Sequence, residues 1–302
     1  MSDIEFRSGF ICLVGRPNTG KSTLTNALVG SKVAITSNRP QTTRHTIRGI
    51  VHREHFQIVL VDTPGLHRPR TLLGKRLNDL VRDTYSEVDV IGLCIPADEP
   101  IGSGDRWIFE QIRAMAPRTT LVVIVTKIDK VPKDRVAAQL MAVNELAGEH
   151  AAAIVPVSAT RGEQVDVLTD VFVDQLGPGP AFYPDGELTD EPEEMLMAEF
   201  IREAALEGVR EEMPHSLAVV IDEVTPREGR DDLIDVHALL YVERDSQKGI
   251  IIGKGGERLK HIGTTARRQI EKLLGTKVYL DLRVKVAKNW QQDPKLLGRL
   301  GF

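Results

Sequence analysis

Short apolar runs alternate with helical stretches over residues 1–176. The runs rich in Val, Ile and Leu are Phe10–Val14, Gln57–Val61, Val88–Ile95, Thr120–Thr126 and Ala153–Val157, each bounded by Gly, Pro or Asp. Continuous apolar runs of this length are typical of strands buried on both faces, with helices as the connections. The pattern predicts an α/β fold: a mostly parallel sheet with helices on both faces and right-handed crossovers.

The pattern changes after residue 176. The segment Gly177–Glu191 has three prolines, three glycines and little apolar periodicity, which is typical of a linker. A length of 302 residues fits two domains, and we expect a first domain at 1–176, a linker at 177–191 and an α+β domain at 192–302. The second domain is predicted from a helix around Glu193–Glu207, strands near Leu217–Val224 and Leu233–Arg244, a helix at Glu257–Leu274 and a strand near Lys277–Ala287.

Composition excludes several classes of protein. The chain is 41% hydrophobic and 27% charged, as in ordinary globular proteins. It has no run of about 18 apolar residues that would indicate a membrane span, and its first ten residues do not resemble a signal peptide. Cys12 and Cys94 both lie in apolar runs, so we expect small buried hydrophobic residues and not a disulfide or metal site. A reducing cytoplasm is the expected location.

Charge is distributed unevenly along the chain. Residues 185–235 contain 17 Asp and Glu but four Lys and Arg, whereas residues 248–288 contain 11 Lys and Arg but three Asp and Glu. A concentrated basic face favours a polyanionic partner for that face. Charge counts taken alone favour a solvated basic helix over a binding face. The acidic block indicates either repulsion of a polyanion or a solvated surface, of which the solvated surface is the favoured interpretation.

A phosphate-binding loop follows the first predicted strand. The residues from Gly15 to Ser22 match the pattern G-x-x-x-x-G-K-[ST], in which backbone N–H groups surround phosphates at the start of a helix. Lys21 is expected to reach the β- and γ-phosphates and Ser22 to bind Mg²⁺. The predicted phosphate-binding residues are Gly15, Arg16, Pro17, Asn18, Thr19, Gly20, Lys21, Ser22 and Thr23.

A carboxylate at the end of the second apolar run fits the metal. Asp62 begins the sequence D-T-P-G, and it would hold Mg²⁺ through water while the N–H of Gly65 meets the γ-phosphate. An isolated D-T-P-G is also a good turn sequence. Its position after a buried strand favours the metal site.

Two further segments follow buried strands and fit recognition of a base. A carboxylate such as Asp129 accepts hydrogen bonds from N1–H and the 2-amino group of guanine, and adenine lacks both donors. The chain order therefore predicts guanine as the base. The predicted base-site residues are Thr126, Lys127, Asp129, Ser158, Ala159 and Thr160.

In this order the motifs G-R-P-N-T-G-K-S, Q-T-T-R, D-T-P-G-L, T-K-I-D and S-A-T resemble a small GTPase of the branch that includes Era, TrmE and EngA. The resemblance implies GTP and GDP as ligands. It also implies that Gln41–Arg44 is the first switch, in which Thr43 or Thr42 binds Mg²⁺, and that the second switch begins at Asp62–Gly65. The implied catalytic residues are Lys21, Thr43, Asp62 and Gly65, and the implied Mg²⁺ ligands are Ser22, Thr43 and Asp62.

The chain departs from this pattern at two positions. Thr126 stands where such GTPases have Asn, so guanine selectivity should rest mainly on Asp129. Leu66 stands where Ras-like GTPases have a water-orienting Gln, so we expect slow intrinsic hydrolysis. Asn18 occupies the position that coordinates K⁺ in this branch, and stimulation by K⁺ is our hypothesis for part of the missing charge stabilisation.

The second domain contains the sequence Gly253-Lys254-Gly255-Gly256 between an apolar run and a basic helix. A G-x-x-G loop of this kind can approach a nucleic-acid backbone closely, and its position resembles a KH domain of the prokaryotic type. KH domains bind single-stranded nucleic acid. The predicted RNA-binding residues are Lys248, Ile251, Ile252, Gly253, Lys254, Gly255, Gly256, Arg258, Lys260, Arg267 and Arg268, although the isoleucines fit a core equally well.

A GTPase domain, a T-D-x-P junction at Thr189–Pro192 and a KH domain together resemble the Era family. The resemblance implies a cytoplasmic GTPase that binds 16S rRNA and assists assembly of the small ribosomal subunit. It also implies a monomer and peripheral membrane association, for which the sequence shows no separate support. TrmE is disfavoured by the absence of a C-terminal cysteine motif and EngA by the single phosphate loop. A purely structural RNA-binding factor remains an alternative, and Trp290 fits either a core position or a base-stacking platform.

Overall fold

The computed structural model describes residues 5–36, 47–62, 71–85, 87–208 and 216–300. These residues form two compact units, and the second contains Ile35, Thr36 and residues 71–76 as well as the residues from Glu191 onward. Within the described ranges, no helix is both long enough and apolar enough to cross a membrane.

The first unit is built on a six-stranded sheet with the order β2-β3-β1-β4-β5-β6. Each neighbouring pair is parallel except β2 and β3, which are antiparallel. Strand β4 is buried throughout, and all but one or two residues of each of β1, β3 and β5 are buried, because helices cover both faces. The strands are β1 (Arg7–Val14), β2 (Ile47–Arg53), β3 (Phe56–Asp62), β4 (Val90–Pro96), β5 (Thr120–Thr126) and β6 (Ala153–Pro156).

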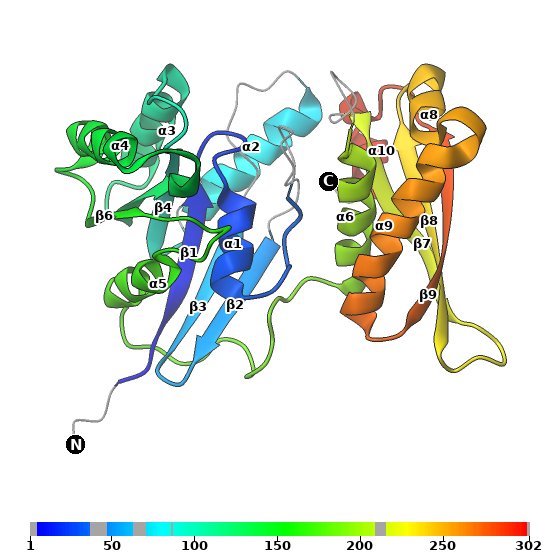
Figure 1. The fold of residues 1–302 in the computed structure, drawn as a ribbon, viewed down its shortest axis with the longest axis horizontal. Helices are drawn as coiled ribbons and strands as arrows, with labels where there is room; N and C mark the ends of the chain where they lie inside the picture. Colours follow the sequence, from blue (N-terminus) through cyan, green and yellow to red (C-terminus); the bar gives the residue numbers. More distant parts are fainter. Residues whose placement is uncertain (1–4, 37–46, 63–70, 86, 209–215, 301–302) are drawn as a thin grey trace. The chain divides into compact units, whose positions relative to one another are not determined.

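Helices cover both faces of this sheet (Figure 1), and a hydrophobic cluster lies on each face. One cluster includes side chains from α2, α3 and α4, and the other includes side chains from α1 and α5. This arrangement places the start of α1 and the carboxyl ends of the parallel strands at one edge of the sheet. The helices are α1 (Lys21–Val29), α2 (Leu72–Tyr85), α3 (Ser103–Met115), α4 (Lys133–Ala147) and α5 (Val165–Asp174), with a 3₁₀ turn η1 at Ile128–Lys130.

The second unit has a three-stranded sheet with the order β7-β8-β9 and helices against one face. Strand β7 (Ala218–Pro226) is antiparallel to β8 (Leu233–Val242), and β8 is parallel to β9 (Lys277–Val286). Alternate residues of β8, from Val236 to Val242, join the core formed with α6 (Glu193–Leu206), α8 (Asp245–Ile252) and α9 (Glu257–Leu274). A 3₁₀ turn η2 (Lys254–Gly256) joins α8 to α9, and η3 (Trp290–Gln292) and α10 (Pro294–Arg299) follow β9.

The predicted fold class is confirmed, and the main difference lies in one strand. The hydrophobic pattern did not predict β2, because the sequence I-R-G-I-V-H-R has polar residues between its apolar ones. This strand is held at the sheet edge by its antiparallel register with β3, from Ile47 opposite Asp62 to Arg53 opposite Phe56.

The segment predicted as a linker is hydrogen-bonded along the first unit. We name residues 177–190 the strap. The buried side chain of Gln57 accepts from the N–H groups of Phe182 and Tyr183 at 2.7 and 3.0 Å and donates to the carbonyl of Tyr183 at 2.8 Å. Further along, Ile50 N–H donates to the carbonyl of Leu188 at 2.9 Å.

The strap ends on a charged contact. Arg48 on β2 forms an ion pair with Asp190 at 3.0 Å, and the hydroxyl of Tyr183 donates to the same carboxylate at 2.7 Å. Asp190 belongs to the T-D-x-P sequence noted at the junction. These contacts associate the strap with the first unit. The domain boundaries at residues 176 and 191 stay a prediction.

Candidate nucleotide and RNA sites

The phosphate loop lies between β1 and α1 at the carboxyl edge of the sheet. Gly15 allows a close approach, because a Cβ there would lie 2.6 Å from the carbonyl oxygen of Cys94. Gly20 has φ +97° and is the N-cap of α1, a backbone conformation that side-chain-bearing residues rarely adopt. Because the backbone N–H groups of a first helical turn lack carbonyl partners of the same helix, the loop and the start of α1 together suit an anion.

Lys21 is the first residue of α1 and is buried within this loop. Its ammonium donates to the carbonyls of Gly15 and Arg16 at 3.1 and 3.0 Å. Burial lowers the pKa of Lys21, and the carboxylate of Asp62 opposes that shift. A buried cation supported mainly by neutral carbonyls is well placed to gain from a phosphate charge.

Ser22 and Asp62 meet beside Lys21, as the sequence predicts for a metal site. The hydroxyl of Ser22 donates to Asp62 at 2.8 Å, although the two residues lie on α1 and at the end of β3. Both present the hard oxygen donors that Mg²⁺ prefers. These residues fit Mg²⁺. Across the described ranges, no cluster of three His, Cys, Asp or Glu forms another candidate metal site.

Arg16 and Asn18 have different settings from the rest of the loop. The Arg16 side chain forms ion pairs with Asp105 at 2.7 Å and Glu99 at 2.9 Å, so its guanidinium is engaged outside the loop. The backbone of Arg16, and not its side chain, is therefore the part expected to contact a nucleotide. Asn18 is exposed and has φ +65°.

The base segment is tied to the phosphate loop through Thr126. The hydroxyl of this buried residue at the end of β5 donates to the carbonyl of Thr19 at 2.6 Å. The one hydroxyl proton of Thr126 is therefore donated to a group of the protein itself. The next residue, Lys127, has φ +58° and pairs with Asp98 at 3.5 Å.

Asp129 is held by the segment that follows β6. Ser158 donates to one carboxylate oxygen at 2.7 Å and Thr160 to the other at 3.3 Å. The hydrogen bond from Ser158 is the main reason that the pKa of Asp129 lies below its ordinary value. The carboxylate is thus fixed in its ionised, accepting form, which suits the two N–H donors of guanine. Ala159 packs beside the core between them.

The predicted switch residues Thr43 and Gly65, together with Thr42 and Leu66, lie outside the described residues. Among the described residues, the structure brings together the predicted phosphate, metal and base residues of α1, β3, β5 and the loop after β6.

The G-x-x-G sequence forms the turn between α8 and α9. Gly253, Gly255 and Gly256 all have positive φ, at +73°, +61° and +82°. A Cβ on Gly253 would lie 2.6 Å from Cβ of Arg258, so the turn also packs closely. Lys254 is exposed within it. The turn thus presents a backbone without bulky side chains and one cation.

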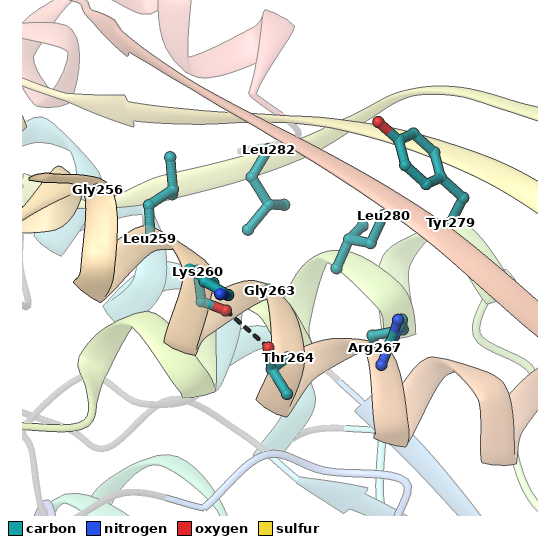
Figure 2. Close-up of a pocket in the computed structure, with 9 residues that line it drawn as sticks. All are labelled: Gly256, Leu259, Lys260, Gly263, Thr264, Arg267, Tyr279, Leu280 and Leu282. Carbon is teal, nitrogen blue, oxygen red and sulfur yellow. Dashed lines mark hydrogen bonds between the residues drawn. The ribbon is translucent and has the colours of Figure 1, made fainter.

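A groove runs from this turn between α9 and β9 (Figure 2). Leu280 and Leu282 point from β9 towards α9, where Lys260, Thr264 and Arg267 lie along the helix. The residues that line the groove are Gly256, Leu259, Lys260, Gly263, Thr264, Arg267, Tyr279, Leu280 and Leu282. An apolar floor with cations along one side suits stacked bases and their phosphates.

Two of the predicted RNA residues have other roles in the structure. Ile251 is fully buried in the core of the second unit, and so it cannot line the groove. Arg258 donates to the carbonyls of Ala205 and Glu207 at 3.2 and 2.7 Å, where it caps the end of α6. Ile252 is partly buried and packs on the same core. Lys248 is half-buried on α8, and Arg268 is exposed but does not line the groove.

Sequence reasoning missed the β9 wall of the groove. Tyr279 is 48% exposed, and Arg227 lies 4.6 Å from the centre of its ring. The predicted strand near Lys277–Ala287 lies in the basic stretch of the chain, and the alternation of apolar and polar residues in β9 contained the signal for a two-faced strand.

Trp290 is a core residue. It is fully buried, and its indole N–H donates to the carbonyl of Ser216 at 3.0 Å. The base-stacking alternative for Trp290 is thereby excluded. Cys12 and Cys94 are buried, as expected, and are not joined in a disulfide, and burial raises the pKa of Cys94 to about 12.

Comparison with known proteins agrees with both sites. Residues 10–127 match a family model described as a 50S ribosome-binding GTPase, and residues 212–291 match a KH domain. The fold and sites define a phosphate-loop GTPase joined to a KH domain. The chain is 86% identical to GTPase Era of Mycobacterium sp. (strain JLS) and 84% identical to that of Mycolicibacterium smegmatis, each over 298 residues and 99% of both chains. The chain belongs to the Era family of GTPases.

Solved structures give the same relationship in three dimensions. The chain superposes with a TM-score of 0.93 on a crystal structure of Era in complex with MgGDPNP and nucleotides 1506–1542 of 16S ribosomal RNA. That protein is 35% identical, and the match covers 98% of this chain and 99% of the other. A second structure, a single-residue variant of Aquifex aeolicus Era bound to GDP.AlF4⁻, is 36% identical with the same TM-score and coverage.

Proposed function

We propose that this GTPase is a switch that binds 16S rRNA through its KH domain and assists assembly of the small ribosomal subunit. Its GTPase domain would be residues 1–176 and its KH domain residues 192–302, joined at 177–191. The observation that carries the proposal is the presence in one chain of a complete phosphate loop and a basic groove. A relative whose structure matches 98% of this chain was crystallised with both a GTP analogue and nucleotides of 16S rRNA.

The nucleotide residues have separate roles in this proposal. The N–H groups of the loop and of the α1 N-terminus hold the phosphates, and Lys21 stabilises the charge that develops on the γ-phosphate. Asp129 accepts from guanine. Ser22 and Asp62 would hold Mg²⁺, which when bound neutralises phosphate charge, and Thr43 and Gly65 would complete the site.

The RNA residues are those that the groove exposes. Lys254, Lys260 and Arg267 are exposed cations at the turn and along α9, suited to phosphates. Leu259, Leu280 and Leu282 offer an apolar surface to bases. The family description that mentions the 50S ribosome covers residues 10–127 alone, whereas a relative of the whole chain carries RNA of the small subunit.

The test is the affinity of the full-length protein for a 16S rRNA 3′-end fragment in two nucleotide states. A switch requires tighter RNA binding with a non-hydrolysable GTP analogue than with GDP. Equal affinities would reduce the protein to a GTPase attached to a constitutive RNA-binding module.

A structural assembly factor is the second candidate, favoured by Leu66 at the position of the water-orienting Gln. The variant Lys21→Ala separates the two. The switch fails to complement a depleted cell after this substitution, and the structural factor still complements it.

Three finer features complete the proposal. Stimulation by K⁺ through Asn18 predicts faster hydrolysis in K⁺ than in Na⁺, and equal rates contradict it. A monomer predicts a single mass near 33.5 kDa in light scattering. Cytoplasmic location with peripheral membrane association predicts that salt or carbonate releases the protein from sedimented membranes.

A further inference from the structure

The Arg16 side chain is held by Asp105 of α3 and by Glu99 in the segment before that helix, and both carboxylates lie outside the motifs of the nucleotide site. Its Nε donates to Asp105 at 2.7 Å and its Nη2 donates to Glu99 at 2.9 Å. The two carboxylates differ in setting, since the Asp105 side chain is 1% exposed and that of Glu99 is 47% exposed. Asp105 is therefore the partner that water screens least.

The local sequence is shaped to receive this arginine. A Cβ on Gly104 would lie 2.7 Å from Cδ of Arg16, so the glycine leaves room for the aliphatic stem. Asp105 accepts from the N–H of Gly102 at 2.8 Å at the start of α3. The carboxylate is thus fixed to the helix on one side and holds the guanidinium on the other.

The backbone of the same arginine is held inside the loop. The carbonyl of Arg16 accepts from the hydroxyl of Thr19 at 3.0 Å and from the ammonium of Lys21 at 3.0 Å. One residue therefore joins the inner contacts of the phosphate loop to an outer contact with α3. Fixing its side chain limits the conformations of the loop when no phosphate is bound.

We propose that Asp105 is a positioning residue for nucleotide binding, which fixes Arg16 so that the phosphate loop is preorganised. The proposal rests on the proposed binding of GTP phosphates at this loop. Because the loop holds the phosphates both before and during reaction, loss of the contact weakens ground state and transition state alike. The expected consequence is a higher KM and a faster loss of GDP, with kcat retained.

Two variants of Arg16 test whether the contact with Asp105 requires a hydrogen-bond donor at the position of Nε. In Arg16→Gln, an amide nitrogen stands at the position of Nε and still donates to Asp105. In Arg16→Met, the stem remains but the donor is lost. We expect Arg16→Met to raise the KM for GTP and the rate of GDP release by roughly ten-fold, the value of a charge-assisted hydrogen bond. Arg16→Gln is expected to recover most of that loss.

Asp105→Asn tests the same contact from the other side, because Asp105 accepts from both Arg16 Nε and Gly102 N–H, and an amide has one oxygen for these two donors. The result should match Arg16→Met. Glu99→Gln is the matched control, since that partner is solvated, and its KM and release rate should stay within about two-fold of wild type.

The measurements are GDP release by displacement of a fluorescent analogue, steady-state hydrolysis, and thermal unfolding of the nucleotide-free protein. A purely structural role lowers the melting temperature without moving KM. Wild-type KM and GDP release in both Arg16→Met and Asp105→Asn overturn the proposal, as does a loss confined to kcat. Failure of the wild-type protein to bind GTP would instead overturn the proposed function.

Discussion

A buried ion pair on α6 gives a prediction whose size follows from its setting. Arg202 donates to Glu199 through Nε at 2.8 Å and Nη2 at 2.6 Å, and the two side chains are 2% and 7% exposed. Arg202→Met retains the unbranched stem of the side chain but leaves the carboxylate buried without this cation. Removing one partner of such a pair costs about 3–5 kcal/mol, a large share of the ~5–15 kcal/mol that stabilises a domain.

The matched control is the double variant Glu199→Gln with Arg202→Met. It removes both charges and should recover most of the lost stability, since the desolvation of an ion pair offsets much of its attraction.

The assay uses the two tryptophans of the chain, one in each unit. Trp290 is fully buried in the second unit, so in a Trp107→Phe background its fluorescence reports that unit alone. Urea titrations give the free energy of unfolding for parent, single and double variants. The reasoning is refuted if the single variant stays within about 1 kcal/mol of its parent, or if the double variant is as unstable as the single one.

Three further predictions concern the two sites. The hydrogen bond from Ser158 holds the pKa of Asp129 below its ordinary value. The contribution of ionised Asp129 to the stability of the folded protein is therefore present above about pH 3.9 and is lost as the pH falls through the depressed pKa. Ser158→Ala should raise that pKa in an NMR titration, and an unchanged pKa would contradict the assignment. Thr126→Val should lower the free energy of unfolding by about 1–3 kcal/mol, because a buried loop carbonyl loses its donor, while Thr126→Ser should not; equal stabilities of the two would rule this out. Lys254→Ala should weaken RNA binding and reduce the slope of log affinity against log salt by about 0.7, whereas the exposed Lys133→Ala should change neither. An unaltered slope in Lys254→Ala would place that lysine away from RNA.

Strands and helices with a large buried surface were predictable, because their burial appears in the sequence as a regular pattern of apolar residues. Strand β5 at Thr120–Thr126 and helix α9 at Glu257–Leu274 have the predicted bounds. Strand β2 was not predictable in this way, since its polar residues follow from a position at the sheet edge and its partner is set by tertiary pairing.

Sequence motifs predicted where the nucleotide and RNA sites lie, but they did not predict the direction in which every side chain points. Spacing alone could not show that Arg16 turns towards Asp105 or that Arg258 caps α6. Ile251 belongs to an apolar run next to a functional turn, and only packing decides which of its members face the core. Asp105 carries no motif, and so its carboxylate became a candidate through geometry alone.

The strap has a consequence for the segment that follows it. Its contacts with β2 and β3 run as far as Asp190, and only the two residues Glu191 and Pro192 lie between that contact and the start of α6 at Glu193. Two extended residues span about 7 Å, and the ring of Pro192 removes one rotatable angle. A segment whose composition is typical of a fifteen-residue linker is therefore bound to the first unit over most of its length, and loss of the Arg48 contact should release its last residues from β2.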